Sequence, residues 1–343
     1  MNDSSILVTG GAGFIGINLA DRLISGGEKI IIYDNLSRSG CKLNLEWLKE
    51  KHGSQSFRLV QADVADYDAL CRAAEGVERI YHLAGQVAVT TSEQNPRFDF
   101  EANALGTFNV LEAARNVGND PILIYSSTNK VYGKIENIST FEEPTRYRFI
   151  DLPMGVSESQ PLDFHSPYGC SKGSGDQYTR DYARMYGLRT VVVRQSCIYG
   201  PRQFGIEDQG WLAWFVIAAV NKRPIRIYGN GKQVRDVLHV HDLISLYQSA
   251  VDHISTAAGQ VYNVGGGPEN TISIWAEFSQ LLEGMLGYSI PVSYGDWRPG
   301  DQYVYVSDIR KAKRELGWSP AISIDEGAKS LINWVRENQK LFV

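Results

Sequence analysis

Residues 8–16 read Val-Thr-Gly-Gly-Ala-Gly-Phe-Ile-Gly, and this stretch decides the fold class. It follows a short apolar run that predicts a strand, Ile6–Thr9, and opens a helical pattern, Ile15–Ser25. Glycine is needed here because a Cβ would block the tight bend and the approach of a pyrophosphate. The free N–H groups at the helix start attract an anion. We interpret the stretch as a dinucleotide-binding turn, rather than an ordinary glycine-rich turn, and assign to the cofactor Gly10, Gly13, Phe14, Ile15 and Gly16.

Short β-rich runs alternate with helical patterns through the first half of the chain. Apolar strands separated by crossover helices are typical of a parallel sheet. The pattern predicts an α/β fold with a Rossmann-like, doubly wound parallel sheet. Its further strands are expected at Lys29–Tyr33, Phe57–Gln61, Arg79–Leu83, Ile122–Ser126, Leu188–Arg194 and Val261–Val264.

The second half changes character. It holds a Gly/Pro-rich stretch at 199–201, an aromatic helix at Trp211–Val220 and a glycine turn at 229–231. We therefore expect a smaller, mixed α/β substrate-binding lobe whose segments interleave with the sheet. The boundaries assign 1–196 and 233–265 to the cofactor domain, and 197–232 and 266–343 to the lobe.

Composition excludes several classes of protein. Hydrophobic residues make up 43% and charged residues 21% of the chain, which is ordinary for a globular protein. The formal net charge of -5 gives no general attraction for nucleic acid. The four cysteines include no CxxC pair, which favours reduced thiols in the cytoplasm over a disulfide framework or a zinc site. No signal peptide or membrane span is expected from the sequence.

Polar and small side chains follow the expected strands, at the edge where open α/β sheets bind ligands. Asp34 ends the second strand, close to the spacing at which a carboxylate accepts hydrogen bonds from an adenosine ribose. Such a carboxylate would repel a 2′-phosphate, so it favours NAD over NADP, although Arg38 lies nearby. A turn-forming role for Asp34 is the alternative. The other cofactor candidates at strand ends are Asn35, Asp63, Val64, Leu83, Ala84, Gly85 and Ser126.

Tyr168 and Lys172 are spaced i and i+4, which places them on one face of a helix that begins near Ser166 and Pro167. A second YxxxK, from Tyr228 to Lys232, spans Gly-Asn-Gly and cannot form a stable helical face. A free tyrosine titrates near pH ~10, so acid/base work on an alcohol at neutral pH needs about 4 kcal/mol of phenolate stabilisation. The Lys172 ammonium and a positive nicotinamide ring can supply it. A surface Tyr/Lys pair is the alternative.

The strand Ile122–Ser126 leads into Ser-Ser-Thr-Asn-Lys-Val-Tyr-Gly at 126–133. A hydroxyl at the carboxyl end of a strand points to the cofactor cleft. We expect Thr128 to orient the substrate hydroxyl and share its proton, while Ser127 equally fits a turn-capping role.

These motifs together resemble the extended short-chain dehydrogenase/reductases that act on sugar nucleotides, the NAD-dependent epimerase/dehydratase family. The resemblance rests on TGGAGFIG (9–16), HLAG (82–85), SSTNKVYG (126–133), YGCSK (168–172) and RDVLHVHD (235–242), and it runs over nearly the whole chain. It implies a Thr128–Tyr168–Lys172 triad, tightly bound NAD and a place for Asn103 near the active site. It also implies a homodimer or homotetramer, in which the helices that hold Asn103 and Tyr168 pair between subunits.

Several stretches resemble one branch of that family, the CDP-tyvelose 2-epimerases. They are DNLSRSG (34–40), NLEWL (44–48), HLAGQVAVTTS (82–92), LDFHSPYGCSKG (162–173), DQGWLAWF (208–215) and GNGKQVRDVLH (229–239). The branch implies that CDP-paratose and CDP-tyvelose interconvert at C2, through oxidation by NAD, rotation of a 2-keto sugar and return of hydride. A UDP-hexose or UDP-hexuronate 4-epimerase is the alternative. Dehydratases of the family follow the triad Thr with Asp-Glu, whereas Asn129-Lys130 stand here, so elimination of water is disfavoured.

A nucleotide diphosphate suits planar guanidinium groups. Arg202, Arg235 and Arg298 resemble the diphosphate binders of the family, with a solvated surface role as the alternative. The family commonly has Asn where this chain has Cys197. Trp211 fits a core role at least as well as a substrate contact. The candidate substrate residues are Gln86, Thr128, Asn129, Cys197, Arg202, Gln209, Arg235 and Arg298.

No metal is expected, because His239 and His241 have no evident third ligand. The expected partner is a small nucleotide sugar, a CDP-deoxyhexose, and neither nucleic acid nor a membrane. A non-catalytic NAD-binding sensor on the same fold is the competing class of function, and the complete triad argues against it.

Overall fold

The computed structural model describes residues 5–298 and 301–342, and the chain divides into two compact units. Unit 1 comprises 1–131, 166–194 and 244–262, and unit 2 comprises 132–165, 195–243 and 263–343. Each unit is built from segments that are far apart in the sequence, as the interleaved pattern of the second half predicts.

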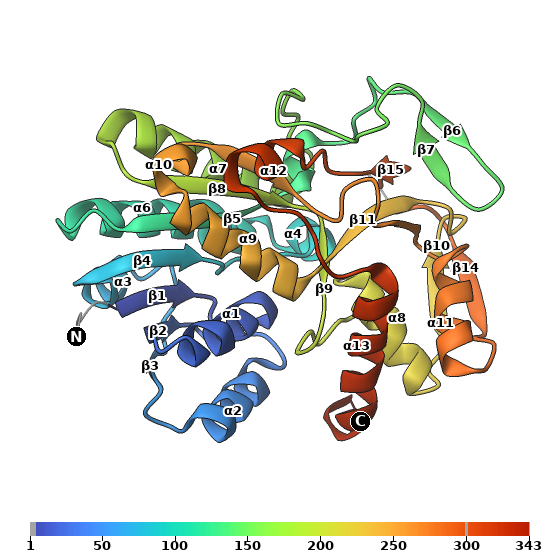
Figure 1. Ribbon diagram of the computed structural model, residues 1–343, viewed down its shortest axis with the longest axis horizontal. Coiled ribbons are helices and arrows are strands. Elements are labelled where there is room, and N and C mark those ends of the chain that lie inside the picture. Colours follow the sequence, from blue (N-terminus) through green and yellow to red (C-terminus); the bar gives the residue numbers. More distant parts are fainter. Residues whose placement is uncertain (1–4, 299–300, 343) are drawn as a thin grey trace. The chain divides into compact units, whose positions relative to one another are not determined.

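Unit 1 holds the Rossmann-like sheet (Figure 1), whose strands run in the order β12-β8-β5-β4-β1-β2-β3. The pairs among β3, β2, β1, β4 and β5 are parallel, in the register Leu7 to Ile31 and Ile80 to Leu123. All seven strands expected from the sequence are present, so the predicted α/β class is confirmed. Their bounds are β1 Ser5–Thr9, β2 Lys29–Tyr33, β3 Phe57–Val60, β4 Val77–His82, β5 Ile122–Thr128, β8 Thr190–Gln195 and β12 Val261–Val264.

Helices cover both faces of this sheet, since alternate side chains of the buried strands point to opposite sides. Leu7, Ile80 and Leu123 pack in one cluster with apolar residues of α3, α6 and α7. On the other face, Tyr247 of α9 contacts Tyr81, with ring centroids 5.9 Å apart. The helices are α1 Phe14–Ser25, α2 Cys41–His52, α3 Tyr67–Ala74, α4 Val89–Gln94, α5 Pro96–Phe100, the π-helical turn η1 Glu101–Leu105, α6 Gly106–Asn116, the 3-10 turn η2 Asn129–Tyr132, α7 Ser166–Tyr186, α9 Val240–Asp252 and α10 Ile254–Ala257.

Unit 2 combines small sheets with helices around an apolar core. The helix α8, Trp211–Val220, is apolar on every side and nearly all of it is buried, against residues of α11 and α13. The strand β11 pairs with β13, β15 and β9, and β10 pairs with β14. The elements are β6 Thr140–Glu142, β7 Tyr147–Phe149, β9 Cys197–Tyr199, β10 Ile225–Tyr228, β11 Val234–His239, β13 Thr271–Ser273, α11 Phe278–Leu286, β14 Val292–Gly295, β15 Val304–Tyr305, α12 Arg310–Leu316, α13 Ile324–Glu337 and the short turn η3 Gln339–Phe342.

The boundaries of the units differ from those expected from the sequence. Residues 132–165, 195–196, 233–243 and 263–265 were expected in the cofactor domain, but they belong to unit 2. The reason is strand pairing: β11 joins β9, β13 and β15 rather than the seven-stranded sheet. The segment at Val156 pairs with Ser307 in the same unit. Pairing over this distance in sequence leaves no local signal in the chain.

Within the described residues, no helix combines the length and the apolar character needed to cross a membrane.

Candidate active site

The glycine turn has the geometry that the sequence predicts for it. Gly10 adopts a left-handed φ of 68° and its N–H donates to the carbonyl of Tyr33 at 2.8 Å. A Cβ on Gly10 would lie 2.7 Å from the backbone nitrogen of Ala84, and one on Gly16 would collide with the carbonyl of Gly10. The first residue of α1 follows Gly13, which offers no side-chain cap to the helix start. Because glycine has no side chain, it does not occupy the first backbone N–H groups of α1. An anion bound at a helix start needs such N–H groups as hydrogen-bond donors.

Asp34 ties the end of β2 to this turn. One carboxylate oxygen accepts from the Ala12 N–H at 3.0 Å and the other from the Leu36 N–H at 2.8 Å. Burial raises the pKa of this carboxyl, while those two backbone donors oppose the shift. Next to it, the Asn35 amide donates to Asp63 at 2.7 Å, so residues from the ends of β2 and β3 meet. The carboxylate keeps further lone pairs for ribose hydroxyls.

These features fit a bound dinucleotide. The turn leaves no room for side chains at two glycines, and small residues, Ala84 and Gly85, follow β4. A Cβ on Gly85 would lie 2.6 Å from Asn103 Oδ1, an oxygen for which the described residues provide no hydrogen-bond partner. Val64 is buried, and one of its methyl groups packs so closely against Gly106 of α6 that a Cβ on that glycine would lie 2.6 Å from it. The glycine turn, Asp34, Asp63 and Ala84 each follow the carboxyl end of a strand of the unit 1 sheet.

Tyr168 and Lys172 lie on α7, which begins at Ser166. Ser166 Oγ accepts from the Gly169 N–H at 3.3 Å and acts as the expected cap. Both side chains are buried, as is Thr128 at the last position of β5. Tyr168 forms a side-chain hydrogen bond with Thr128, and Lys172 Nζ donates to the carbonyl of Ser126 at 2.6 Å. The structure therefore brings the phenol, the ammonium group and the threonine oxygen together in unit 1.

Burial dominates the acid/base properties of this cluster. It raises the pKa of Tyr168 to about 12, against the effects of the Thr128 hydrogen bond and Arg38. It lowers the pKa of Lys172 to about 7, against the charges of Asp176 and Asp99. The side chains of the protein alone thus do not bring Tyr168 near neutrality. The positive nicotinamide ring of a bound NAD is the second source of phenolate stabilisation expected from the sequence.

Unit 1 also contains a buried ion pair, between Arg194 and Asp176, that was not expected from the sequence. Arg194 of β8 binds Asp176 of α7 through two hydrogen bonds of 2.8 Å, and both side chains are at most 2% exposed. Ser127 Oγ donates to the same carboxylate at 2.7 Å. This pair fixes β5 next to α7, so it holds Thr128 opposite Tyr168. Breaking one partner of such a pair costs about 3–5 kcal/mol.

Asp99, which was not singled out from the sequence, accepts hydrogen bonds from two candidate site residues. Gln86, a substrate candidate, and Asn103, a cofactor candidate, both donate to the buried carboxylate of Asp99. Both donors of the Gln86 amide are used, since the second binds the carbonyl of Ala88 at 2.7 Å. Asn129 accepts from Thr128 Oγ1 at 3.3 Å. The sequence signal that could have identified Asp99 is its spacing, four residues before Asn103, which places both side chains on one face of a helix.

The arginines expected to bind a diphosphate all lie in unit 2, and two of them contact acidic residues there. Arg235 is 5% exposed and its guanidinium binds Asp301 at 2.6 Å. Arg298 binds the carboxylate of Asp208 at 3.0 Å and stacks over the ring of Tyr228 at 4.2 Å. These contacts hold the guanidinium groups in defined positions within the unit.

The remaining substrate candidates are also in unit 2. Arg202 has a left-handed φ of 68°, a strained conformation for a residue with a side chain, and its guanidinium lies 5.8 Å from the ring of Trp334. Gln209 closes a tight turn by exchanging backbone hydrogen bonds with Ile206. Cys197 Sγ accepts from the Trp211 indole N–H at 3.5 Å, so Trp211 contacts both the core and a candidate residue.

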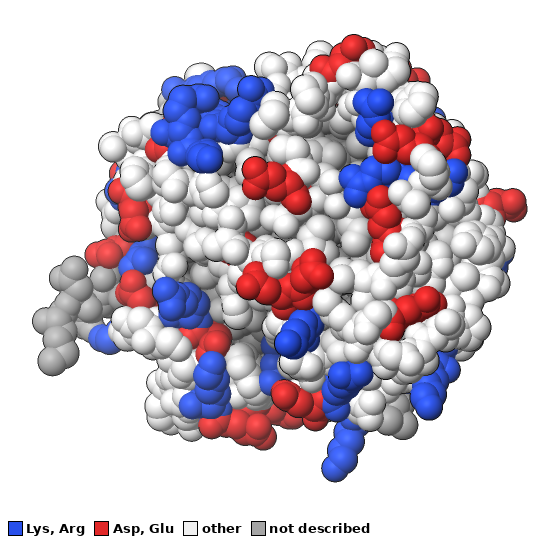
Figure 2. Space-filling view, turned by 45° about the vertical axis from the view of Figure 1, so that its right-hand side comes forward, with Lys and Arg blue, Asp and Glu red and all other residues white. Residues whose placement is uncertain are grey.

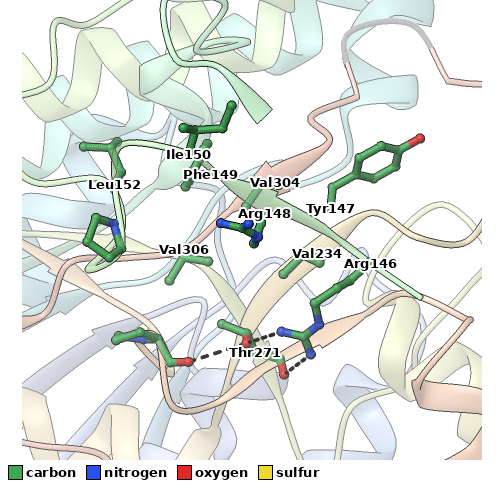
Figure 3. A pocket seen from close by; sticks show the side chains of 12 residues that line it. Arg146, Tyr147, Arg148, Phe149, Ile150, Leu152, Val234, Thr271, Val304 and Val306 are labelled. Carbon is green, nitrogen blue, oxygen red and sulfur yellow. Dashed lines mark hydrogen bonds between the residues drawn. The ribbon is translucent and has the colours of Figure 1, made fainter. Parts of the chain in front are cut away.

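Unit 2 also contains a separate cavity of about 250 Å³ (Figure 3). Apolar side chains such as Phe149, Val234 and Val304 line it, and Arg146 at its edge donates to Thr271 at 3.1 Å. Arg146 also binds Glu277 at 2.6 Å, so its charge is compensated. None of the triad residues lines this cavity. Among the residues that the structure describes, no group of three or more His, Cys, Asp or Glu side chains could hold a metal ion.

Comparisons with known proteins show which family this chain resembles. Residues 7–331 match the family model described as GDP-mannose 4,6 dehydratase. The chain is 46% identical over 336 residues to a CDP-paratose 2-epimerase of Salmonella typhi, an alignment that covers 96% of this chain and 98% of the relative.

Two solved structures are similar over their whole length. One is a double mutant of DesIV, a dTDP-glucose 4,6-dehydratase of Streptomyces venezuelae with NAD bound, at a TM-score of 0.84 and 29% identity, covering 98% of each chain. The other is a UDP-glucose 4-epimerase of Thermotoga maritima with UDP-glucose, at a TM-score of 0.83 and 30% identity, covering 98% of this chain and 99% of the other.

Proposed function

This chain belongs to the family described as GDP-mannose 4,6 dehydratase, whose members are extended short-chain dehydrogenase/reductases, and on that premise we propose that it epimerises CDP-paratose to CDP-tyvelose at C2. It is an NAD-dependent sugar-nucleotide epimerase. The observation that carries the reaction type is the buried Thr128–Tyr168–Lys172 cluster in the unit that also holds the glycine turn. The substrate is inferred from the identity of 46% to a CDP-paratose 2-epimerase.

The residues of the chain supply positioning and proton transfer. Thr128 Oγ1 and the Tyr168 phenol orient the C2 hydroxyl, and the Tyr168 phenolate takes its proton. The turn at Gly10 and the Asp34 carboxylate would hold NAD, which would supply the acceptor for the C2 hydride and the donor for its return. Lys172 lies one helical turn from Tyr168 and its ammonium group favours the phenolate. On the return step, Tyr168 gives the proton back to the C2 oxygen, so protons and electrons balance. The 2-keto sugar exposes its other face in between, which inverts C2.

The absence of an acid pair after Thr128 favours epimerisation over loss of water. Elimination needs a general acid and a base beside the sugar. Asn129 and Lys130 stand at the two positions after Thr128. Asn129 Oδ1 accepts from the Thr128 hydroxyl at 3.3 Å, so the amide supports the triad and supplies no proton.

Separate assays with CDP-paratose and UDP-glucose, both run in D2O, test the proposed reaction. We expect CDP-tyvelose to form from CDP-paratose, with no deuterium at C2, because the hydride removed is the one returned. Turnover of UDP-glucose alone would establish the 4-epimerase instead. Deuterium at C2 of the product would show exchange with solvent and contradict the hydride mechanism.

Replacing Tyr168 by Phe tests the role of the phenol. We expect Tyr168→Phe to lose at least about 1000-fold in kcat, roughly 4 kcal/mol, while NAD stays bound. Tyr67→Phe is the matched control, because the Tyr67 hydroxyl lies at the surface and accepts from Asn116. Full activity of Tyr168→Phe would revive the non-catalytic sensor as the function of this chain.

The expected partners are a second copy of the chain and a small nucleotide sugar. Exposed apolar side chains gather on α5, η1, α6 and α7 of unit 1, and such patches on soluble proteins commonly mark interfaces. They are Phe98, Phe100, Leu105, Phe108, Tyr178, Met185 and Tyr186. The formal net charge of -5 does not favour nucleic acid as a partner, although Figure 2 shows one group of basic side chains at the upper left of the face that it draws. The free cysteines support a reducing, cytoplasmic location.

A further inference from the structure

Asp99, on α5, has a buried carboxylate that no part of the proposed chemistry uses. Its side chain is 0% exposed and accepts hydrogen bonds from three side chains. The Gln86 amide donates at 2.9 Å, the Asn103 amide at 3.1 Å and the Ser171 hydroxyl at 2.5 Å. The donors come from the loop after β4, from η1 and from α7, so one carboxylate connects three elements around the site.

A carboxylate can only accept, so it decides which way the neighbouring amides face. The NH2 groups of Gln86 and Asn103 must both point to Asp99, because a flipped amide would set its oxygen against the carboxylate. The Oδ1 of Asn103 is thereby turned to the opposite side. There it lies beside Gly85, and a Cβ on that glycine would be 2.6 Å from Oδ1 and 3.9 Å from Lys172 Nζ.

Asp99 also orients a side chain of α7, because the Ser171 hydroxyl donates to it. Ser171 stands directly before Lys172, and its hydroxyl lies 3.1 Å from the Asn103 amide and 3.2 Å from the carbonyl of Tyr168. The hydroxyl donor of Ser171 and the amide donors of Asn103 are thus arranged around one anion. The buried charge also acts on the two titrating groups of the triad. It raises the pKa of Tyr168 and opposes the lowering of the Lys172 pKa.

We propose that Asp99 is a positioning residue of the epimerase site, one that orients the Asn103 and Gln86 amides and the Ser171 hydroxyl around Lys172. The inference rests on the proposed function, because it concerns the same triad. The other charged and titratable groups that face Tyr168 and Lys172 are Asp176 of α7, His82 of β4, Tyr125 of β5 and Arg38 after β2.

The variants Asp99→Asn and Asp99→Ala separate charge from orientation. An Asn at 99 can still accept from Gln86 and Asn103 through its oxygen and can donate to Ser171. We therefore expect Asp99→Asn to keep kcat at its pH optimum within about fivefold. Asp99→Ala leaves the amides free to turn, and we expect kcat to fall at least about tenfold with KM nearly unchanged.

The pH profile supplies a readout that a purely structural role would not move. Loss of the negative charge lowers the pKa of Tyr168 and that of Lys172, so both limbs of the kcat profile of Asp99→Asn move to lower pH. We expect a shift of at least about half a unit. Ser171→Ala keeps the charge, so its profile should stay in place even if the rate falls. Asp66→Asn is the matched control, since Asp66 caps α3 at the Ala69 N–H and Asn caps equally well.

A titration without substrate keeps the inference separate from the proposed reaction. The ultraviolet difference between each holoenzyme and its Tyr168→Phe counterpart reports the phenolate of Tyr168. We expect it to form at lower pH in Asp99→Asn than in the wild type. If CDP-paratose is not turned over, the proposed reaction fails and this titration still decides the role of Asp99. Unshifted titrations and profiles in Asp99→Asn, or wild-type kcat in Asp99→Ala, would overturn the inference.

Discussion

At the scale of single residues, His82 shows how burial sets the protonation state. The side chain is completely buried at the end of β4, between Thr9 Oγ1 at 2.8 Å and Thr107 Oγ1 at 2.9 Å. Thr107 donates its hydroxyl hydrogen to the carbonyl of Asn103, so it accepts from Nε2–H of His82. Burial, with a further contribution from the Lys172 charge, lowers the pKa of His82 to about 3.

This low pKa predicts a dependence of stability on pH. The unfolded chain binds a proton at His82 below about pH 6.5, whereas the folded protein does so only near pH 3. The contribution of His82 is therefore complete above pH ~6.5 and is lost as the pH falls towards 3, by up to about 1.4 kcal/mol per pH unit. Urea unfolding of His82→Gln at several pH values should show a slope smaller by about that amount.

The exposed residue His253 provides the control for this measurement. His253→Gln controls for the substitution itself, because it makes the same change at a histidine whose ring lies at the surface. Equal slopes in all three proteins would mean that His82 is not held in the neutral form.

At the scale of elements, the glycine turn between β1 and α1 makes a sharp prediction. We expect Gly10→Ala to abolish tight NAD binding and to destabilise the protein, since the new Cβ would meet the Ala84 backbone at 2.7 Å in a left-handed conformation. Gly27, just after α1, also has a positive φ, of 81°, but a Cβ added there would have no atom within 4 Å. Gly27→Ala is therefore the matched control. It should therefore cost about 1 kcal/mol of stability and leave NAD in place.

The bound cofactor can be released by heat from each purified variant and quantified. Retention of NAD by Gly10→Ala, at the wild-type ratio, would contradict the role given to this turn. Loss of NAD from both variants would point to general destabilisation instead.

Elements also show which parts of the fold the sequence can predict. The seven strands of unit 1 were predictable because strands buried on both faces form continuous apolar runs, such as residues 30–33 and 122–125. The hairpin of β6 and β7 was not, since residues 140–149 mix charges and aromatics without a clear period. Strand β11 has a clear sequence pattern for a strand, but its partner strands are distant in the sequence. Its place in unit 2 could therefore not be predicted.

The same distinction holds within the site. The glycine turn and the pair of Tyr168 and Lys172 stand out in the sequence because their spacing is local. Thr128 lies far from that pair in the sequence, and its role was expected from its place at the end of a strand. The ion pair of Asp176 and Arg194 and the carboxylate of Asp99 depend on contacts between separate elements. Such contacts leave only isolated charged residues in the sequence, where a charged side chain is most often solvated.

At the scale of the whole molecule, the exposed apolar side chains of α5, η1, α6 and α7 predict self-association. Phe100 is 58% and Phe108 is 38% exposed, and Phe108 contacts Tyr178 of α7 with ring centroids 5.9 Å apart. A surface of this kind, presented by elements that pack on one another in unit 1, suits a two-fold interface in which the same patch on each copy faces the other. The helix that carries Tyr168 would then also support the subunit contact, so disruption of the interface should reduce activity as well as association.

Charged substitutions in this patch test the interface by sedimentation or light scattering. We expect the wild type to be a dimer or tetramer, and the double variant Phe100→Glu with Phe108→Glu to be smaller by at least one association step, because two buried carboxylates per copy would have to lose their water. Tyr294→Glu is the matched control, since Tyr294 is 59% exposed but lies on β14 of unit 2. A wild type that is monomeric at all concentrations, or a double variant of unchanged size, would show that this patch does not bind a second copy.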